Sequence, residues 1–124
     1  MASAKNFEDL EVWQKASELA VKIYKLTLQQ AFNRDFALRD QIRKSAISIS
    51  SNIAEGFEYG NNKDFIRFLR YAKGSAGELR SQLYLAQRLG YADDQAHKLM
   101  HKELLYLSRQ ISSLIKYLKT HTKY

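Results

Sequence analysis

The chain has 124 residues, a net charge of +7, and neither cysteine nor proline. Its length suits one domain with its own core, and the lack of cysteine excludes disulfides, thiolate metal sites and cysteine redox chemistry. No apolar run approaches the length of a membrane span and the first residues have no signal-peptide core, so we expect a cytoplasmic protein. The absence of proline favours long helices with short connections.

The first predicted helix covers residues 10–29. Its charged residues fall on one narrow strip, and apolar or small residues occupy more than half of its circumference. A bundle helix needs an apolar stripe of only about 100° against the core. The surplus predicts a second buried face on this helix.

The second predicted helix covers residues 37–56. Glycine ends many helices because it adopts the left-handed conformation without strain, so Gly56 marks the expected C-terminus. An apolar seam faces the core: Ile42, Ala46, Ile49 and Ile53. A polar arc runs beside this seam: Ser45, Ser48, Asn52 and Glu55.

The third and fourth predicted helices cover residues 63–89 and 94–119, separated by a break at Gly90. Both carry apolar residues at alternating spacings of four and three, which is the heptad pattern of packed helices. The seam of the third helix is Phe65, Leu69, Ala72, Ala76, Leu79, Leu83 and Ala86. The seam of the fourth helix is Met100, Leu104, Leu107, Ile111, Leu114 and Leu118.

Four amphipathic helices with short links predict an all-α fold. The arrangement that buries all four seams is an up-down-up-down antiparallel four-helix bundle. We expect it to form a single domain over residues 1–124.

The polar arc of the second helix borders the core, where polar groups need partners. The third helix offers small residues and a carboxylate in residues 74–79, so we expect the two helices to approach closely. Asn52 and Glu55 would hydrogen-bond across the helices or to backbone near the turn. The following residues are interpreted as a structural motif that sets helix register: Ser48, Asn52, Glu55, Gly56, Gly74 and Glu78.

Two observations concern the surface of the third helix. Gly74 and Gly77 each cost about 1 kcal/mol in a helix relative to alanine, which predicts the close approach of another helix backbone. A second apolar arc, next to the seam, predicts a homo-oligomer that packs through the first and third helices, because monomers rarely expose large apolar patches. The arc consists of Phe68, Tyr71, Leu85 and Leu89.

No complete catalytic or metal-binding set is visible, so we expect no enzyme activity, no catalytic residue, no metal and no cofactor. The one suggestive pair is His97 and His101, four positions apart. In the zinc protease motif a glutamate follows the first histidine, whereas Lys98 stands here and a third ligand is missing. The pair is therefore interpreted as two histidines at the edge of an amphipathic helix.

The excess of basic over acidic residues lies in the second half of the chain. Residues 61–90 hold six basic and two acidic side chains, and residues 91–124 hold six basic and three acidic ones. On the third helix the basic residues share an arc of about 140° with Tyr84. Arginines beside an aromatic ring can hold phosphates and stack on bases, although a solvated basic face has the same pattern. The candidate nucleic-acid contacts are Arg67, Arg70, Lys73, Arg80 and Arg88.

Several segments, in order and at matching spacing, resemble the four-helix-bundle family encoded in intervening sequences of bacterial 23S ribosomal RNA genes. The most specific are "SNIAEG" at residues 51–56, Asp64-Phe65, and Gly74-Ser75 followed by Glu78-Leu79. One departure is Asn33 after Phe32, where the family commonly has proline. The resemblance implies a small cytoplasmic bacterial protein without an established activity. Similar bundles form homopentamers, and related accessory variability proteins of retroelements bind nucleic acid and a reverse transcriptase.

Two functions remain open from the sequence. The first is a non-enzymatic oligomeric bundle that binds RNA or another nucleic acid through the basic stripe. The alternative is a protein-interaction adaptor whose stripe docks an acidic or nucleic-acid-processing partner.

Overall fold

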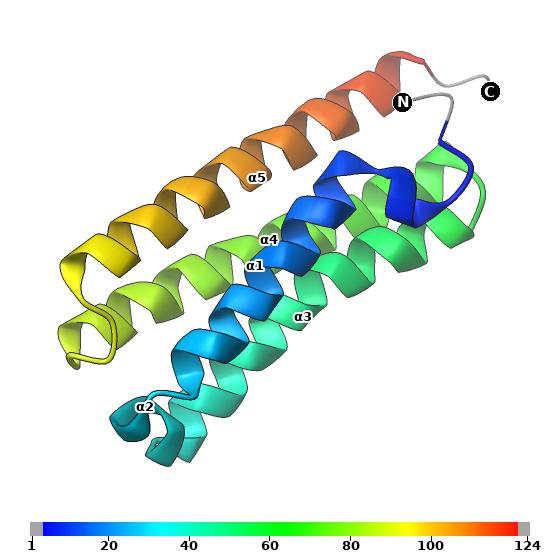
Figure 1. Cartoon of the computed structure of the whole chain (residues 1–124). Coiled ribbons are helices and arrows are strands. Elements are labelled where there is room, and N and C mark those ends of the chain that lie inside the picture. The colour runs from blue at the N-terminus through cyan, green and yellow to red at the C-terminus, as the bar shows by residue number, and fades with distance from the viewer. Residues whose placement is uncertain (1–3, 122–124) are drawn as a thin grey trace.

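The computed structural model describes residues 4–121, whose regular elements are all helices, and this confirms the predicted all-α class. Four long helices are present, as the sequence predicts, together with two short ones (Figure 1). The elements are the 3-10 helix η1 (Phe7–Asp9), α1 (Glu11–Thr27), α2 (Gln30–Arg34), α3 (Phe36–Glu58), α4 (Asn62–Arg88) and α5 (Asp94–Thr120).

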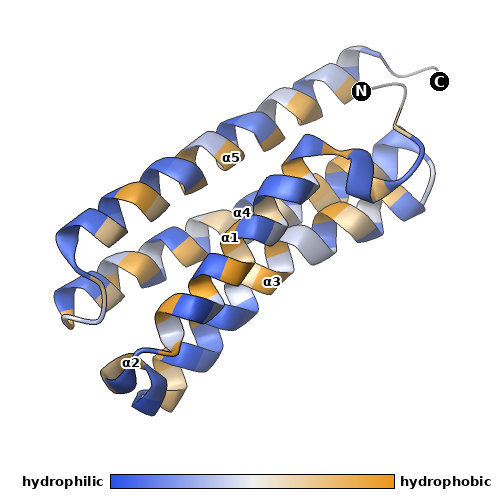
Figure 2. Ribbon diagram, in the orientation of Figure 1, coloured by the Kyte–Doolittle hydropathy of each residue, from blue (hydrophilic) through white to orange (hydrophobic). Residues whose placement is uncertain are grey.

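The four long helices pack in a ring, in which α1 contacts α3 and α5, and α4 contacts α3 and α5. The α3–α4 pair has the most extensive contact. Apolar residues recur along all four (Figure 2). The predicted seams form the core: every seam residue of α3 and α4 is buried, and on α5 all but the partly buried Met100.

The short α2 occupies the segment that was expected to be a plain connection. Phe32 is fully buried, and its ring stacks on Tyr91 with 4.8 Å between centroids. The Tyr91 hydroxyl donates a hydrogen bond to Asp35 Oδ2 at 2.9 Å, while Asp35 Oδ1 caps α3 by accepting from the Leu38 amide. These contacts tie the α1–α3 connection to the α4–α5 loop, far apart in sequence.

The end of α3 differs from the prediction. The helix continues past Gly56 to Glu58, and Gly60, with φ of 76°, is the glycine that adopts the left-handed conformation there. Gly56 is required for another reason, since a Cβ at this position would lie 2.6 Å from the Cβ of Phe68. Gly90 ends α4 with φ of 82°, as predicted.

The glycines within α4 also differ from expectation. A Cβ added at Gly74 or Gly77 would meet nothing within 4 Å. The close approach of another helix that was predicted at these positions is therefore wrong within the chain, where both residues are exposed.

Part of the predicted second apolar face is exposed. Tyr71 and Leu85 on α4, and Leu89 directly after it, are about half exposed, as are apolar residues on α1. Phe68 is buried instead, because Tyr59 stacks on its ring at 5.2 Å between centroids. No helix within residues 4–121 has the length and apolar character that a bilayer span requires.

Candidate nucleic-acid interface

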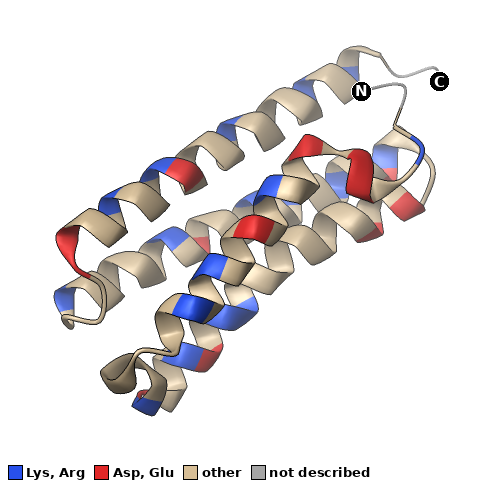
Figure 3. Ribbon diagram, viewed as in Figure 1, with Lys and Arg blue, Asp and Glu red and all other residues tan. Residues whose placement is uncertain are grey.

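The candidate contacts form a stripe along α4, and all five side chains are exposed. Basic residues outnumber acidic ones on α4 and on its neighbour α5 (Figure 3). The stripe turns outward because the heptad seam on the opposite side of α4 is buried against α3 and α5. Helical periodicity thus fixes both the core face and the charged face of this helix.

Arg67 differs from the other members of the stripe. Its guanidinium pairs with Asp64 at 3.1 Å and lies 4.5 Å from the ring centroid of Phe68. The hydrogen bond from Asn61 and the contact with Arg67 lower the pKa of Asp64 below its usual value. The charge of Arg67 is thus partly neutralised within the chain, which the sequence pattern did not reveal.

The other four stripe residues make no ion pair or hydrogen bond with any part of the chain that the structure describes. Long cationic side chains without a nearby carboxylate are those best placed to exchange counterions for the phosphates of a nucleic acid. They are Arg70, Lys73, Arg80 and Arg88.

Sequence reasoning missed three cations that face the same side of the molecule. Lys98, Lys102 and Arg109 on α5 line a hollow that also includes Tyr84 of α4. Their spacings of four and seven residues place them on one face of α5, which the sequence does indicate. Only the packing of α5 on α4 brings them beside Tyr84.

The predicted polar joint exists, with different partners. The Ser48 and Ser75 hydroxyl groups lie 2.8 Å apart and join α3 to α4. The Asn52 amide donates to the Ser48 carbonyl and hydroxyl, at 2.8 and 3.0 Å, and so bonds within its own helix. Glu55 and Glu78 are exposed and have no polar partner among the described residues, so the expected pairing of Glu55 is wrong.

The histidine pair lies where α5 packs on α4, beside the apolar seam of α5. His97 is buried and packs against Tyr84, with 4.6 Å between ring centroids, while His101 is partly buried. No group of three or more His, Cys, Asp or Glu side chains suited to a metal ion occurs within residues 4–121. The pair belongs to the hollow that Lys98 and Lys102 also line.

Comparison with known proteins identifies the family of the chain. The model of the 23S rRNA-intervening sequence protein family matches residues 8–113. The chain belongs to this family. A crystal structure of a protein of unknown function from the S23 ribosomal protein family of Bacteroides thetaiotaomicron superposes with a TM-score of 0.77 at 29% identity, covering 85% of this chain and 98% of that one. Comparison with curated proteins found no match.

In this 23S rRNA-intervening sequence family member, the matched region contains the whole of the candidate interface. It includes α4 with its basic stripe, the Ser48–Ser75 joint, and the three cations of α5. The resemblance that the "SNIAEG" segment indicated is therefore confirmed. Family membership supplies the fold and leaves the function to be argued from the surface of this chain.

Proposed function

We propose that this protein is a non-enzymatic, oligomeric helical bundle that binds RNA through the basic surface of α4. One observation carries the proposal: four exposed cations project from one helix and have no carboxylate partner among the described residues. Such a row matches the spaced charges of a phosphate backbone. An exposed tyrosine on the same face, Tyr84, adds a surface on which a base can stack.

The proposal takes the four long helices as an up-down-up-down antiparallel bundle. It is supported by the ring of contacts between neighbouring helices and by the short connections between consecutive ones. In that arrangement α4 and α5 lie side by side, so their charges add to one field.

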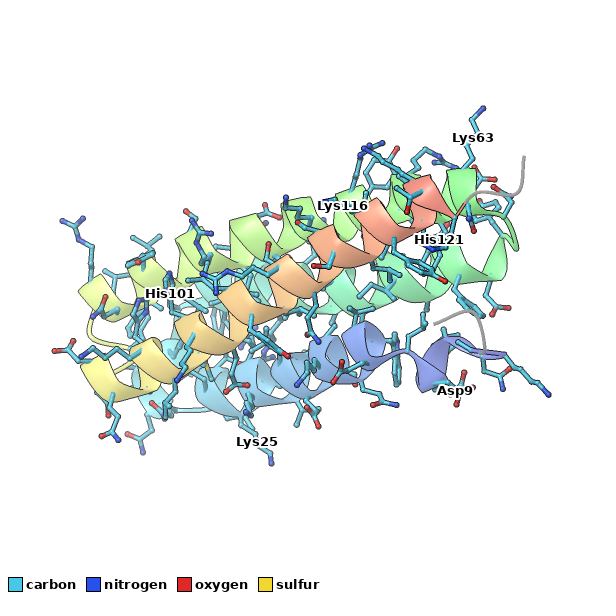
Figure 4. The ribbon with its side chains drawn as sticks, turned by 90° about the horizontal axis from the view of Figure 1, so that it is seen from above. Asp9, Lys25, Lys63, His101, Lys116 and His121 are labelled. Carbon is cyan, nitrogen blue, oxygen red and sulfur yellow. The ribbon has the colours of Figure 1, made fainter. Side chains whose placement is uncertain are left out.

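Salt-dependent binding of structured RNA tests the proposal. We expect the logarithm of the binding constant to fall linearly with the logarithm of the salt concentration. Arg80→Gln should weaken binding and lower the slope by about 1, the effect of one lost phosphate contact. Lys25→Gln is the matched control, because Lys25 is an exposed cation on α1, away from α4 in Figure 4. Absence of salt-dependent binding at low ionic strength would overturn the proposal.

Oligomer formation is supported by the apolar side chains that α1 and α4 leave exposed. A monomer rarely keeps such an area in water. Leu85→Asp, on α4, should dissociate the oligomer, whereas Leu99→Asp, on α5, should not; the two leucines are 49% and 57% exposed. Light scattering measures the result. A wild-type particle of 14.4 kDa, the mass of one chain, would rule out the oligomer.

A protein-interaction adaptor is the second candidate function. It is favoured by the cluster in which Arg67 lies against the rings of Tyr59, Phe68 and Tyr71. Arginine and tyrosine are enriched at protein interfaces and in their hot spots. A partner that remains bound after nuclease treatment, and is lost in Tyr71→Ala, would support this function over RNA binding.

A further inference from the structure

A hollow of about 580 Å³ lies between the C-terminal half of α4 and the N-terminal half of α5. Pockets for small organic ligands have volumes of about 300 to 1,000 Å³, so the volume of this open hollow is in the range for a ligand such as one nucleotide. Its walls combine aromatic rings with cations: Tyr84, Gln87, Asp94, His97, Lys98, His101, Lys102, Leu105 and Arg109.

Three rings form one side of the hollow. Tyr84 lies 4.6 Å from His97 and 5.2 Å from His101 between ring centroids, and its hydroxyl is 3.2 Å from His101 Nε2. Tyr84 keeps 46% of its surface exposed. An exposed ring held in place by two others is a suitable platform for stacking a planar base.

His97 forms part of the inner wall of the hollow. The residue is only 6% exposed, and its Nδ1 atom is buried without a hydrogen-bond partner in the described part of the chain. Buried polar atoms in folded proteins are nearly always paired, and each exception calls for an explanation. Because this atom is enclosed by the protein, the ring contributes to the wall by packing against Tyr84.

The charge of the hollow selects an anion. Lys98, Lys102 and Arg109 line it, against the single carboxylate of Asp94, which already accepts a hydrogen bond from Gln87 at 2.9 Å. Burial, and then the charges of His97 and Arg80, lower the pKa of His101, so this ring is mainly neutral at neutral pH. A neutral ring stacks on a base without the cost of desolvating a charge.

We propose that this hollow binds one nucleotide, with its base against Tyr84 and His101 and its phosphate held by Lys98, Lys102 and Arg109. The same chemistry occurs in a free mononucleotide and in one unit of an RNA strand. Only the second source rests on the proposed function, in which the α4 cations hold the neighbouring phosphates. The proposal adds residues of α5, and a defined place for one base and its phosphate, to the basic surface of α4.

Titration of the full-length protein with adenosine monophosphate, followed by NMR of the histidine rings, tests the site. The chain has three histidines, and His121 lies toward the opposite end of α5 from His101 (Figure 4). Resonances of His97 and His101 should shift while His121 does not. No shift at millimolar nucleotide, or an equal shift at His121, would overturn the site.

Two variants separate the base from the phosphate. Tyr84→Leu should weaken nucleotide binding about fivefold or more, the effect of one lost stacking contact. Tyr106→Leu is the matched control, because Tyr106 is 51% exposed on α5 and lies outside the hollow. Lys102→Gln should weaken binding of adenosine monophosphate and leave binding of adenosine unchanged. Equal affinities of the two tyrosine variants would overturn the assignment of the base platform.

A short single-stranded oligoadenylate distinguishes the two sources of the nucleotide. If the unit belongs to a strand, Tyr84→Leu should weaken oligoadenylate binding while leaving its salt dependence unchanged. If wild type binds the mononucleotide and shows no salt-dependent binding of the strand, the site stands and the proposed function fails. If the strand binds with salt dependence and Tyr84→Leu matches Tyr106→Leu, the proposed function stands and the nucleotide site fails.

Discussion

At the scale of single residues, this protein depends on glycines for different reasons. Gly60 and Gly90 adopt positive φ angles at helix ends, whereas Gly56 leaves room for the first turns of α4. Gly74 and Gly77 face open space and have regular helical conformation. Substitutions at these positions therefore have opposite expected signs.

Gly56→Ala should lower the free energy of unfolding by about 1 to 3 kcal/mol, because the added methyl group overlaps the Cβ of Phe68 and the core must shift. Gly77→Ala is the control, and it should raise the stability by about 0.5 to 1 kcal/mol, because alanine favours the helix and meets no atom. Urea unfolding measures both. Equal stability of Gly56→Ala and wild type would show that α3 and α4 separate at little cost.

Tyr91→Phe should lower the stability by about 1 kcal/mol, since it removes one hydrogen bond, to Asp35, and keeps the ring that stacks on Phe32. Tyr106→Phe provides the comparison, because Tyr106 is exposed and its hydroxyl makes no hydrogen bond within residues 4–121. Thermal unfolding of both variants checks this. A loss of stability in Tyr106→Phe equal to that in Tyr91→Phe would contradict the assigned role of Asp35.

At the scale of elements, the contact between α4 and α5 brings ionisable groups of the two helices together. Tyr84 on α4 packs against His97 and His101 of α5, and Lys98 and Lys102 line the same hollow. Arg80 on α4 lies close enough to His101 to lower its pKa. The helices thus bring positive charges toward two imidazoles. Protonation of either imidazole adds another charge of the same sign.

The folded protein should lose stability as the pH falls. The pKa of His101 is lowered in the fold, so the unfolded chain binds the proton first, near the usual value of about 6.5. The contribution of the neutral His101 ring to stability is therefore fully present above about pH 6.5, and it is lost as the pH falls toward the lower pKa of the folded state. Urea unfolding at about pH 7.5 and about pH 5.5 measures it. His101→Gln should reduce the difference in stability between the two pH values, and His121→Gln should leave it unchanged. The reverse result would contradict the lowered pKa of His101.

At the scale of the whole molecule, the exterior combines an excess of positive charge with exposed apolar side chains. The positive excess lies on α4 and α5, and α1 and α4 each leave apolar side chains exposed. An assembly that buries the apolar part would leave the cations in water and repeat them around its axis. Charge repeated in this way strengthens the field that attracts a polyanion.

If copies associate through this apolar surface, the unfolding temperature should rise with protein concentration, because mass action favours the associated state. Thermal unfolding over about a hundredfold range of concentration measures the effect. Leu85→Asp should remove the dependence. An unfolding temperature of wild type that does not change with concentration would contradict association through this surface.

The sequence by itself determined the all-α class, the four long helices, their buried seams and the family, because each follows from local periodicity and from short motifs. Predicted helix ends fell within about two residues of the observed ones. Only the tertiary structure decided which faces meet. In the structure Gly56 lies in a close contact with α4 and not at the end of its helix, and Gly74 and Gly77 face open space. Arg67 pairs with Asp64, and Tyr84 lies beside His97 and His101. The physical reason is that periodicity encodes which side of a helix is buried, whereas the partners across an interface depend on the register between helices distant in sequence.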